Sequence, residues 1–317
     1  MKKNILVTGG AGFIGSNLVE TLLNDNRVGK VRVLDNLSTG YFQNIQEFKT
    51  HPNFEFVLGD IRDYETCLSA CAGVHLVCHQ AALGSVPRSI KDPLTSNAVN
   101  ITGTLNIFQA AVQQGIQRVV FAASSSTYGD SKGLPKVEDR IGRPLSPYAV
   151  TKYVMELYAD VFSKTYPFSY VGLRYFNVFG PKQSPNGAYA AVIPLFIKHA
   201  KENTAPTING DGTFSRDFTY VANAVQANVL ALFTDKETAI NQIYNVACGD
   251  QTTLNELWDM IKSVSGCTVD AIHGASRIGD IPHSLADVTK IKSLLAYEEK
   301  VKIKEGLHLT ITSKQWA

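Results

Sequence analysis

The chain has 317 residues, a length that suits one large domain or two modest ones. A formal net charge of +2 and the lack of a basic run argue against a nucleic-acid partner. No stretch approaches the roughly 20 apolar residues of a membrane span, and the run at residues 5–7 is too short for a signal peptide. The five cysteines lack CxxC spacing, which predicts free thiols in a reducing cytoplasm, and the histidines lack metal spacing, so we expect no metal.

The first residues predict a strand, a glycine-rich turn and the start of a helix. A buried strand over residues 3–8 leads into Gly9, Gly12 and Gly15, and an amphipathic helix is expected from Ser16 to about residue 24. The first glycine permits a tight turn, the second lets the backbone approach a pyrophosphate, and the third lets the helix pack on the strand. The helix N-terminus offers free N–H groups to phosphate oxygens. A glycine-rich turn without a ligand is the alternative.

A second strand, residues 31–34, ends in Asp35, and this acid weighs against a plain turn. Asp35 follows Gly15 at about the ~20-residue distance expected of a carboxylate that binds the adenosine ribose. It would accept hydrogen bonds from both ribose hydroxyls and repel a 2′-phosphate, which predicts NAD rather than NADP. The segment 36–40 would then wrap the adenosine.

Two more strands are predicted at residues 54–58 and 75–82. Asp60 follows the first, where it could meet an adenine amino group or be an ordinary loop residue. Ala81 and Ala82 end the second, and their small side chains would let the backbone approach a cofactor.

A long helix is expected over residues 95–114, with Asn100 either on the surface or bracing a catalytic helix. A fifth strand, residues 118–123, opens into a hydroxyl-rich segment at 124–127. A hydroxyl cluster at the carboxyl end of a strand suits the binding of an alcohol substrate, although serines are also frequent in ordinary loops.

The stretch from Ser146 to Lys152 contains the pair with the clearest chemistry. Pro147 suits the first turn of a helix and Ser146 suits its N-cap. Tyr148 and Lys152 are four residues apart, so the phenol and the ammonium project from one helix face. A free tyrosine, with a pKa near ~10, is a poor base at neutral pH, and a nearby ammonium favours the phenolate. The pair predicts a general base for an alcohol that loses hydride, although surface Tyr and Lys at this spacing are common.

Beyond this helix the elements become shorter. A sixth strand with its exit is predicted at residues 170–180, and the composition changes after Pro181. A polar loop is expected at residues 182–189, and extended segments are expected at 206–208 and 244–247. Further helices are expected at 192–200, 222–233, 253–264 and 287–295, and they leave a polar tail.

Several motifs, in the order found, resemble the extended short-chain dehydrogenase/reductase family. They are TGGAGFIG (8–15), DNLSTG (35–40), GDIRD (59–63), HQAA (79–82), SSSTYG (124–129), YAVTK (148–152) and RYFNVFGP (174–181). Downstream, NGDG (209–212), RDFTYV (216–221) and the segment 277–284 resemble the nucleotide-sugar epimerases. Over nearly the whole chain the similarity is closest to the bacterial UDP-N-acetylglucosamine 4-epimerases.

The resemblance implies an α/β fold, a doubly wound parallel (Rossmann) sheet with a smaller, discontinuous α/β substrate domain. We expect residues 1–181 with about 213–248 to bind NAD, and residues 182–212 with 249–317 to bind a UDP-sugar.

The implied reaction is reversible C4 epimerisation of UDP-N-acetylglucosamine through a 4-keto sugar, with the hydride held on bound NAD. Tyr148 would act as the base, Ser124 would bond the sugar O4, and Lys152 would hold the nicotinamide ribose and lower the pKa of Tyr148. The implied cofactor-binding residues are Gly9, Gly12, Phe13, Ile14, Gly15, Asp35, Asn36, Ser38, Thr39, Gly40, Asp60, Ile61, Gln80, Ala81, Ala82, Asn100, Tyr148, Lys152 and Tyr175.

The implied substrate-binding residues are Gly84, Ser85, Ser124, Ser125, Ser126, Asn177, Val192, Asn209, Arg216, Arg277, Asp280 and Ser284. Arg216 and Arg277 match the clamp on the diphosphate, whose oxygens suit guanidinium groups. Ser284 takes a place that can hold tyrosine in related epimerases, and it would leave room for an N-acetyl group at the sugar C2.

Three other functions share parts of this pattern. A dTDP-glucose 4,6-dehydratase would have Asp-Glu just before the Tyr-Gly segment, whereas this chain has the hydroxyl residues 125–127. An epimerase or decarboxylase of UDP-uronic acids stays open. A non-catalytic NAD-binding regulator ranks low because such proteins commonly lack the Tyr148 and Lys152 pair.

The family also implies a homodimer through the helices at 95–114 and 149–163. Its apolar face could comprise Val154, Leu157, Tyr158, Val161 and Phe162, which core packing would explain nearly as well.

Overall fold

The structure is a computed structural model that describes residues 1–186, 190–275 and 282–316. Within these residues, seven parallel strands form the main sheet in the order β11-β6-β5-β4-β1-β2-β3. Its strands are β1 (Lys3–Thr8), β2 (Val28–Asp35), β3 (Phe54–Leu58), β4 (Leu76–His79), β5 (Arg118–Ser124), β6 (Tyr170–Tyr175) and β11 (Gln242–Val246). The order reverses direction next to β1, as it does in a doubly wound fold, so the predicted fold class is confirmed.

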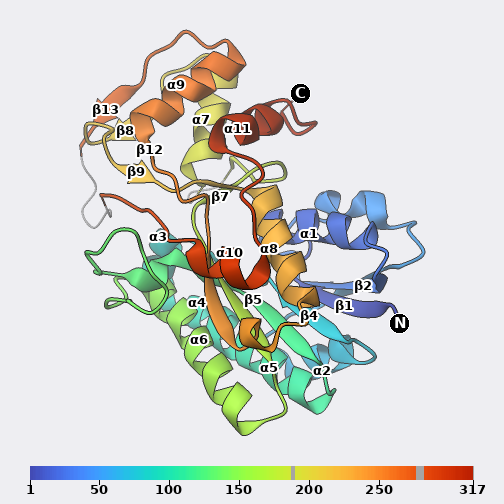
Figure 1. Ribbon diagram of the computed structural model, residues 1–317. Helices are drawn as coiled ribbons and strands as arrows, with labels where there is room; N and C mark the ends of the chain where they lie inside the picture. Colours follow the sequence, from blue (N-terminus) through green and yellow to red (C-terminus); the bar gives the residue numbers. More distant parts are fainter. Residues whose placement is uncertain (187–189, 276–281, 317) are drawn as a thin grey trace.

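Helices cover both faces of this sheet (Figure 1). Successive strand residues point to opposite faces: Ile5 and Val7 pack in one buried core, and Leu6 packs in the other. The helices of the main sheet are α1 (Phe13–Leu23), α2 (Tyr64–Cys71), α3 (Val86–Lys91), α4 (Pro93–Asn97), α5 (Gly103–Gln113), α6 (Pro147–Thr165) and α8 (Val221–Phe233). Because both faces are buried, the central strands are nearly continuous apolar runs, which explains why the sequence predicts them well.

Shorter elements gather above one end of the sheet, where Figure 1 shows α7, α9 and α11 with small strands beside them. The elements outside the main sheet are β7 (Val178–Phe179), α7 (Val192–Lys201), β8 (Thr207–Asn209), β9 (Ser215–Arg216), β10 (Thr219–Tyr220), β12 (Thr252–Thr253), α9 (Leu254–Ser265), β13 (Ile272–Gly274), α10 (Thr289–Leu295) and α11 (Ile303–Ile311). The short helical turns are η1 (Phe42–Asn44), η2 (Gln46–Phe48), η3 (Ala98–Thr102), η4 (Ser125–Tyr128) and η5 (Glu237–Ala239).

The helix expected over residues 95–114 is divided in the structure. α4 passes into the π-helical turn η3 before α5 begins. A π-helical turn adds a residue to the helix and turns its side chains, and these turns are frequent at functional sites. Here the turn carries the fully buried Asn100.

The prediction of a polar tail after residue 295 is wrong, because the helix α11 forms there. Leu307 and Ile311 lie one turn apart on this helix and are buried in the core that contains α8 and α9. The apolar stripe is difficult to recognise in the sequence, because lysines, a glutamate and a histidine lie between its residues.

No helix among the described residues is long and apolar enough to cross a membrane. All five cysteines are buried free thiols.

Candidate active site

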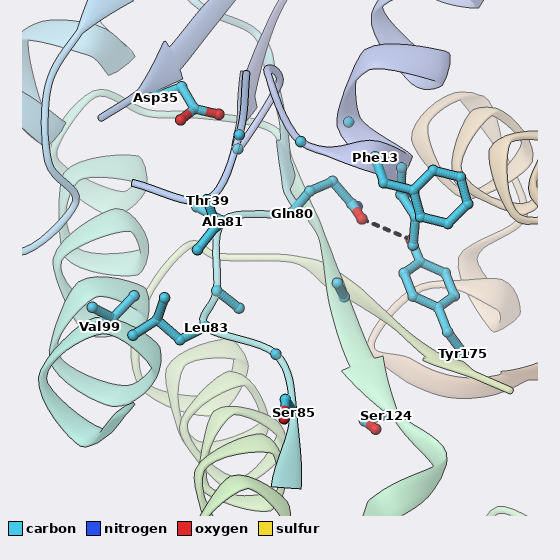
Figure 2. Close-up of a pocket in the computed structure, with 18 of the residues that line it drawn as sticks. Phe13, Asp35, Thr39, Gln80, Ala81, Leu83, Ser85, Val99, Ser124 and Tyr175 are labelled. Carbon is cyan, nitrogen blue, oxygen red and sulfur yellow. Dashed lines mark hydrogen bonds between the residues drawn. The ribbon is translucent and has the colours of Figure 1, made fainter. Parts of the chain in front are cut away.

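A cleft of about 600 Å³ opens at the carboxyl ends of the main-sheet strands. It is lined by the glycine turn after β1, the end of β2, the segment after β4, the end of β5 and the first turns of α6. Figure 2 shows Asp35 and Ser124 in different parts of this cleft, with Gln80 between them and Tyr175 to the right of Gln80. In doubly wound sheets, ligands bind in this crevice.

The glycine turn leaves no room for larger residues. Gly9 has a φ of +68°, and a Cβ there would lie 2.7 Å from the backbone nitrogen of Ala81. A Cβ on Gly15 would collide with the carbonyl oxygen of Gly9, where α1 approaches β1. Gly12 precedes the first residue of α1 and lines the cleft. The turn therefore keeps its backbone exposed at the helix N-terminus, where phosphate groups bind.

Asp35 is fixed at the end of β2 by two backbone donors. Its carboxylate accepts from the N–H of Ala11 at 2.9 Å and from the N–H of Leu37 at 2.8 Å. Burial raises the pKa of Asp35, and both hydrogen bonds oppose that rise. The carboxylate lines the cleft with acceptor capacity left for ribose hydroxyls.

Asp60 is held at the end of β3 as an ionised group. A hydrogen bond from the Arg62 guanidinium lowers the pKa of Asp60 to about 2. Asn36 donates to the same carboxylate through Nδ2 at 2.8 Å. Asp60 thus joins the segment after β2 to the segment after β3, and both segments line the cleft.

Tyr148 and Ser124 meet in the cleft from different elements. Ser146 caps α6 by accepting from the N–H of Ala149 at 3.1 Å, as the sequence predicts. The N–H of Tyr148 donates to Ser89 Oγ of α3 at 2.9 Å, which ties this turn of α6 to a second helix. Ser124 ends β5, and its hydroxyl is hydrogen-bonded to the Tyr148 phenol.

The expected lowering of the Tyr148 pKa by Lys152 is not found. Burial raises the pKa of Tyr148, and only the hydrogen bond with Ser124 opposes the rise. Lys152 Nζ donates to the carbonyl of Ala122 at 2.7 Å and lies 5.9 Å from the centre of the Tyr148 ring. Burial lowers the pKa of Lys152 to about 8, while the charge of Glu156 opposes this. The ammonium is thus buried beside the base and aimed at the end of β5.

Asn100 contributes to the site from behind it. Its side chain donates to Thr151 Oγ1 at 3.0 Å and to the Leu83 carbonyl at 3.1 Å, and it accepts from the Leu83 N–H at 2.8 Å. These bonds use its amide, so Asn100 does not line the cleft but braces α6 and the segment after β4. Of the two roles considered from the sequence, full burial rules out a surface position, and the contact with Thr151 fits a residue that braces α6.

The other predicted cofactor-binding residues all line the cleft, together with Gly84, Ser85, Ser124, Ser125 and Asn177 of the predicted substrate-binding set. Five further substrate-binding candidates lie outside this lining: Ser126, Val192, Asn209, Arg216 and Ser284. Arg277 and Asp280 lie outside the described residues.

The contacts of four of these five explain their positions. Ser126 donates to Ser124 Oγ at 2.9 Å, and Arg216 donates to the carbonyls of Ser215 and Pro282. Asn209 belongs to β8, which pairs with β13. Val192 packs against the core at the start of α7, directly after Ala191, which does line the cleft.

The sequence analysis missed some cleft residues, namely Leu34, Gly59, Leu83, Val99, Ala122, Ala123, Val178, Gln183 and Ala191. Gln183 is the most informative of these. Its Nε2 donates to the carbonyl of Val178 at 3.2 Å, whereas its buried Oε1 has no partner among the described residues. A buried amide oxygen without a partner in a cleft is typical of a ligand contact. Its only signal in the sequence is its place in the polar loop after Pro181.

The residues present fit a dinucleotide cofactor. The glycine turn at the N-terminus of α1 suits the pyrophosphate, Asp35 suits an unphosphorylated ribose, and the Tyr148–Lys152 pair lies at the other end of the same cleft. This combination defines an NAD-dependent enzyme of the short-chain dehydrogenase/reductase type. The chain belongs to the NAD dependent epimerase/dehydratase family, whose model matches residues 5–247.

Relatives of known structure cover almost the entire chain. A UDP-N-acetylglucosamine 4-epimerase from Methanobrevibacter ruminantium M1, solved with UDP-N-acetylmuramic acid, is 40% identical with a TM-score of 0.92, and the match covers 100% of this chain and 98% of that one. A UDP-glucose 4-epimerase from Thermus thermophilus, solved with NAD, is 35% identical with a TM-score of 0.87, and the match covers 97% of each chain. A UDP-glucose 4-epimerase from Mycolicibacterium smegmatis is 35% identical over 308 residues, 96% of each chain.

Proposed function

We propose that this protein is a UDP-sugar 4-epimerase that interconverts UDP-N-acetylglucosamine and UDP-N-acetylgalactosamine, and also accepts UDP-glucose and UDP-galactose. The observation that carries the proposal is that Tyr148, Ser124 and Lys152 share one cleft with the glycine turn and Asp35. A base at one end and a dinucleotide site at the other are what a transient oxidation of a sugar alcohol requires. The similarity to 4-epimerases over almost the entire chain supports the same class of reaction.

The chain's own residues divide the chemistry between them. NAD, when bound, accepts a hydride from the sugar C4 and later returns it to the opposite face. Tyr148 takes the O4 proton as the 4-keto sugar forms and gives it back when the alcohol is restored. Ser124 holds O4 beside the phenol through the hydroxyl that already contacts Tyr148. Lys152 supplies a buried positive charge that favours the phenolate once a ligand redirects its ammonium from Ala122.

Charge in the cleft favours a neutral sugar. Among the described residues that line it, Lys152 is the only lysine or arginine. A uronic acid would add a carboxylate to this part of the cleft, and an enclosed carboxylate needs a cation of its own. Gln183, whose buried amide oxygen has no partner among the described residues, suits instead a neutral donor such as a hydroxyl or an acetamido N–H.

The test is NMR of purified protein incubated separately with UDP-N-acetylglucosamine, UDP-glucose and UDP-glucuronate, without added cofactor. We expect new signals of the C4 epimer from the first two nucleotides and none from the third. Turnover of UDP-glucuronate alone would replace the proposal with the uronic-acid alternative. No turnover of any of the three by NAD-loaded protein would favour a non-catalytic regulator.

We also infer a homodimer that forms through the outer face of α6. Val150, Leu157 and Val161 are exposed on this helix, at 45%, 48% and 54%, and Leu94 is 82% exposed on α4, which packs against α6. Phe162, expected on the same face, is instead buried against Phe108 and Phe168. The occupant we propose for this apolar face is the same face of a second copy, since a twofold dimer pairs identical surfaces.

A further inference from the structure

Three polar side chains from distant parts of the chain meet behind the cleft. Gln80 follows β4, Tyr175 ends β6, and Asn228 lies on α8. Gln80 and Tyr175 line the cleft, and Figure 2 shows the hydrogen bond between them. We call Gln80, Asn228 and Tyr175 the floor triangle.

The hydrogen bonds of the floor triangle form a closed cycle. The Tyr175 hydroxyl donates to Gln80 Oε1 at 3.1 Å, Gln80 Nε2 donates to Asn228 Oδ1 at 3.0 Å, and Asn228 Nδ2 donates to the Tyr175 oxygen at 2.7 Å. Each group donates once and accepts once within the cycle. Hydrogen bonds that run in one direction around a cycle strengthen one another, and Asn228 is fully buried, where such bonds are strongest.

The remaining protons of the two amides are also used. Asn228 Nδ2 donates to the Ala224 carbonyl at 2.7 Å, and Gln80 Nε2 donates to Cys78 Sγ at 3.3 Å. The Cys78 thiol in turn donates to Asn228 Oδ1 at 3.1 Å. No proton of the floor triangle is therefore left over for a ligand in the cleft.

This arrangement separates the roles of the two tyrosines that line the cleft. The single proton of Tyr175 is committed to Gln80, and burial raises the pKa of its hydroxyl far above the ordinary range. Tyr175 can thus offer its ring to a ligand, but not its hydroxyl proton. The Tyr148 phenol is instead hydrogen-bonded to another hydroxyl, that of Ser124, which leaves it available for proton transfer.

We propose that Asn228 is a positioning residue for the cofactor, holding the Tyr175 ring and the Gln80 segment in the shape that NAD requires. α8 packs against α1, whose N-terminus suits the pyrophosphate, so Asn228 joins the helix layer behind the glycine turn to the ends of β4 and β6. Without Asn228, the amide of Gln80 and the hydroxyl of Tyr175 each lose a buried partner and turn elsewhere. The proposal rests on NAD binding in this cleft and not on the identity of the sugar.

The test compares Asn228→Ala with Asn223→Ala, a matched change on the same helix. Asn223 is buried and donates to the Val301 carbonyl at 2.7 Å, away from the floor triangle. We expect both variants to melt at a lower temperature than the wild type. Calorimetric titration of nucleotide-free protein with NAD should show a dissociation constant at least tenfold higher for Asn228→Ala, and a change below twofold for Asn223→Ala.

Tyr175→Phe provides a second route that keeps the aromatic ring. It breaks the cycle by removing one hydroxyl, so NAD binding should weaken at least tenfold. The double variant that combines Asn228→Ala with Tyr175→Phe should bind NAD no more weakly than Asn228→Ala alone, because both changes break the same cycle. NAD affinity equal to wild type in Tyr175→Phe, or in a folded Asn228→Ala, would overturn the proposal. Tyr175→Phe decides the question if Asn228→Ala does not fold. These experiments measure NAD binding and not the turnover of UDP-sugars, so their outcome does not depend on whether the proposed substrate is correct.

Discussion

At the scale of single residues, the base and the ribose acid owe their properties to different neighbours. Burial raises the pKa of Tyr148, so its phenol keeps its proton in this structure. Burial also raises the pKa of Asp35, but two backbone N–H groups keep its carboxylate oriented. These surroundings suit the proton exchange proposed for Tyr148 and the ribose binding proposed for Asp35.

Tyr148→Phe removes the phenolic oxygen and leaves the ring in place. We expect turnover of UDP-N-acetylglucosamine to fall at least ~100-fold, the usual scale for the loss of a general base. The fold should persist, because Tyr148 is tied to Ser89 through its backbone N–H, which the substitution keeps. Turnover is measured by NMR, and NAD content and melting temperature serve as controls. Near-normal turnover would sink the assignment of Tyr148 as the base.

Asp35→Ala should relax the preference for NAD over NADP. The carboxylate repels a 2′-phosphate and accepts from ribose hydroxyls, so its loss should weaken NAD binding and remove the bias against NADP. The measurement is a competition titration of nucleotide-free protein with both cofactors. If wild-type protein already binds the two equally, the role given to Asp35 is wrong.

At the scale of elements, hydrogen bonds join segments that lie far apart in the chain. The segment 284–287 shows this most clearly. Its backbone is held by hydrogen bonds from the Ser284 N–H to the Ser215 carbonyl at 3.1 Å and from the Lys136 N–H to the Leu285 carbonyl at 2.7 Å. The N–H of Ala286 donates to the buried carboxylate of Asp217 at 3.2 Å. This segment cannot easily move aside for a larger residue.

Ser284→Tyr tests the proposed space for an N-acetyl group. Because the backbone of Ser284 is held at Ser215, a tyrosine ring must occupy space that the serine leaves open. We expect loss of turnover of the N-acetylated sugars and continued turnover of UDP-glucose. A steric block should exceed the ~1–3 kcal/mol effect of one methylene group. Ser284→Ala is the matched control and should turn over both kinds of sugar as the wild type does. If Ser284→Tyr turned over UDP-N-acetylglucosamine at the wild-type rate, the assignment of Ser284 to the N-acetyl space would be wrong.

Elements differed in how far the sequence could predict them. β1, the glycine turn and the start of α6 are predictable because apolar runs, glycines and the Ser146–Pro147 cap act over a few residues. The helix expected over 95–114 conceals the π-helical turn, where Asn100 bonds to Leu83 and Thr151, residues distant in the chain. The spacing of residues within the segment 95–114 does not indicate partners that lie elsewhere in the chain.

At the scale of the whole molecule, the same limit explains what the sequence analysis missed. The floor triangle joins Gln80 to Asn228 across 148 positions of the chain, so no motif contains both. Gln183 lines the cleft because the chain turns after β7, and its sequence neighbours do not mark it. The motifs thus identify the groups that we propose to react, whereas the residues that contact these groups become apparent only once the order of the strands is known.

The whole molecule also has an exposed apolar face, and its proposed partner is a second copy. α6 carries Tyr148 and Lys152 in its first turns and exposes Leu157 and Val161 further along. Burying this face in a dimer would hold the helix that bears the base, since apolar area removed from water contributes about 25 cal/mol per Å².

Val161→Glu places a charge in the proposed interface and should convert the dimer to a monomer. The physical reason is that an unpaired carboxylate is costly to bury, whereas on an exposed helix surface it is nearly neutral. Light scattering coupled to size-exclusion chromatography gives the mass, for comparison with the 34.6 kDa of one chain. Lys304→Glu is the matched control: this exposed lysine lies on α11, away from the proposed interface, and its change should leave the dimer intact. A monomeric wild type, or a Val161→Glu variant that keeps the mass of two chains, would show that α6 does not form the interface.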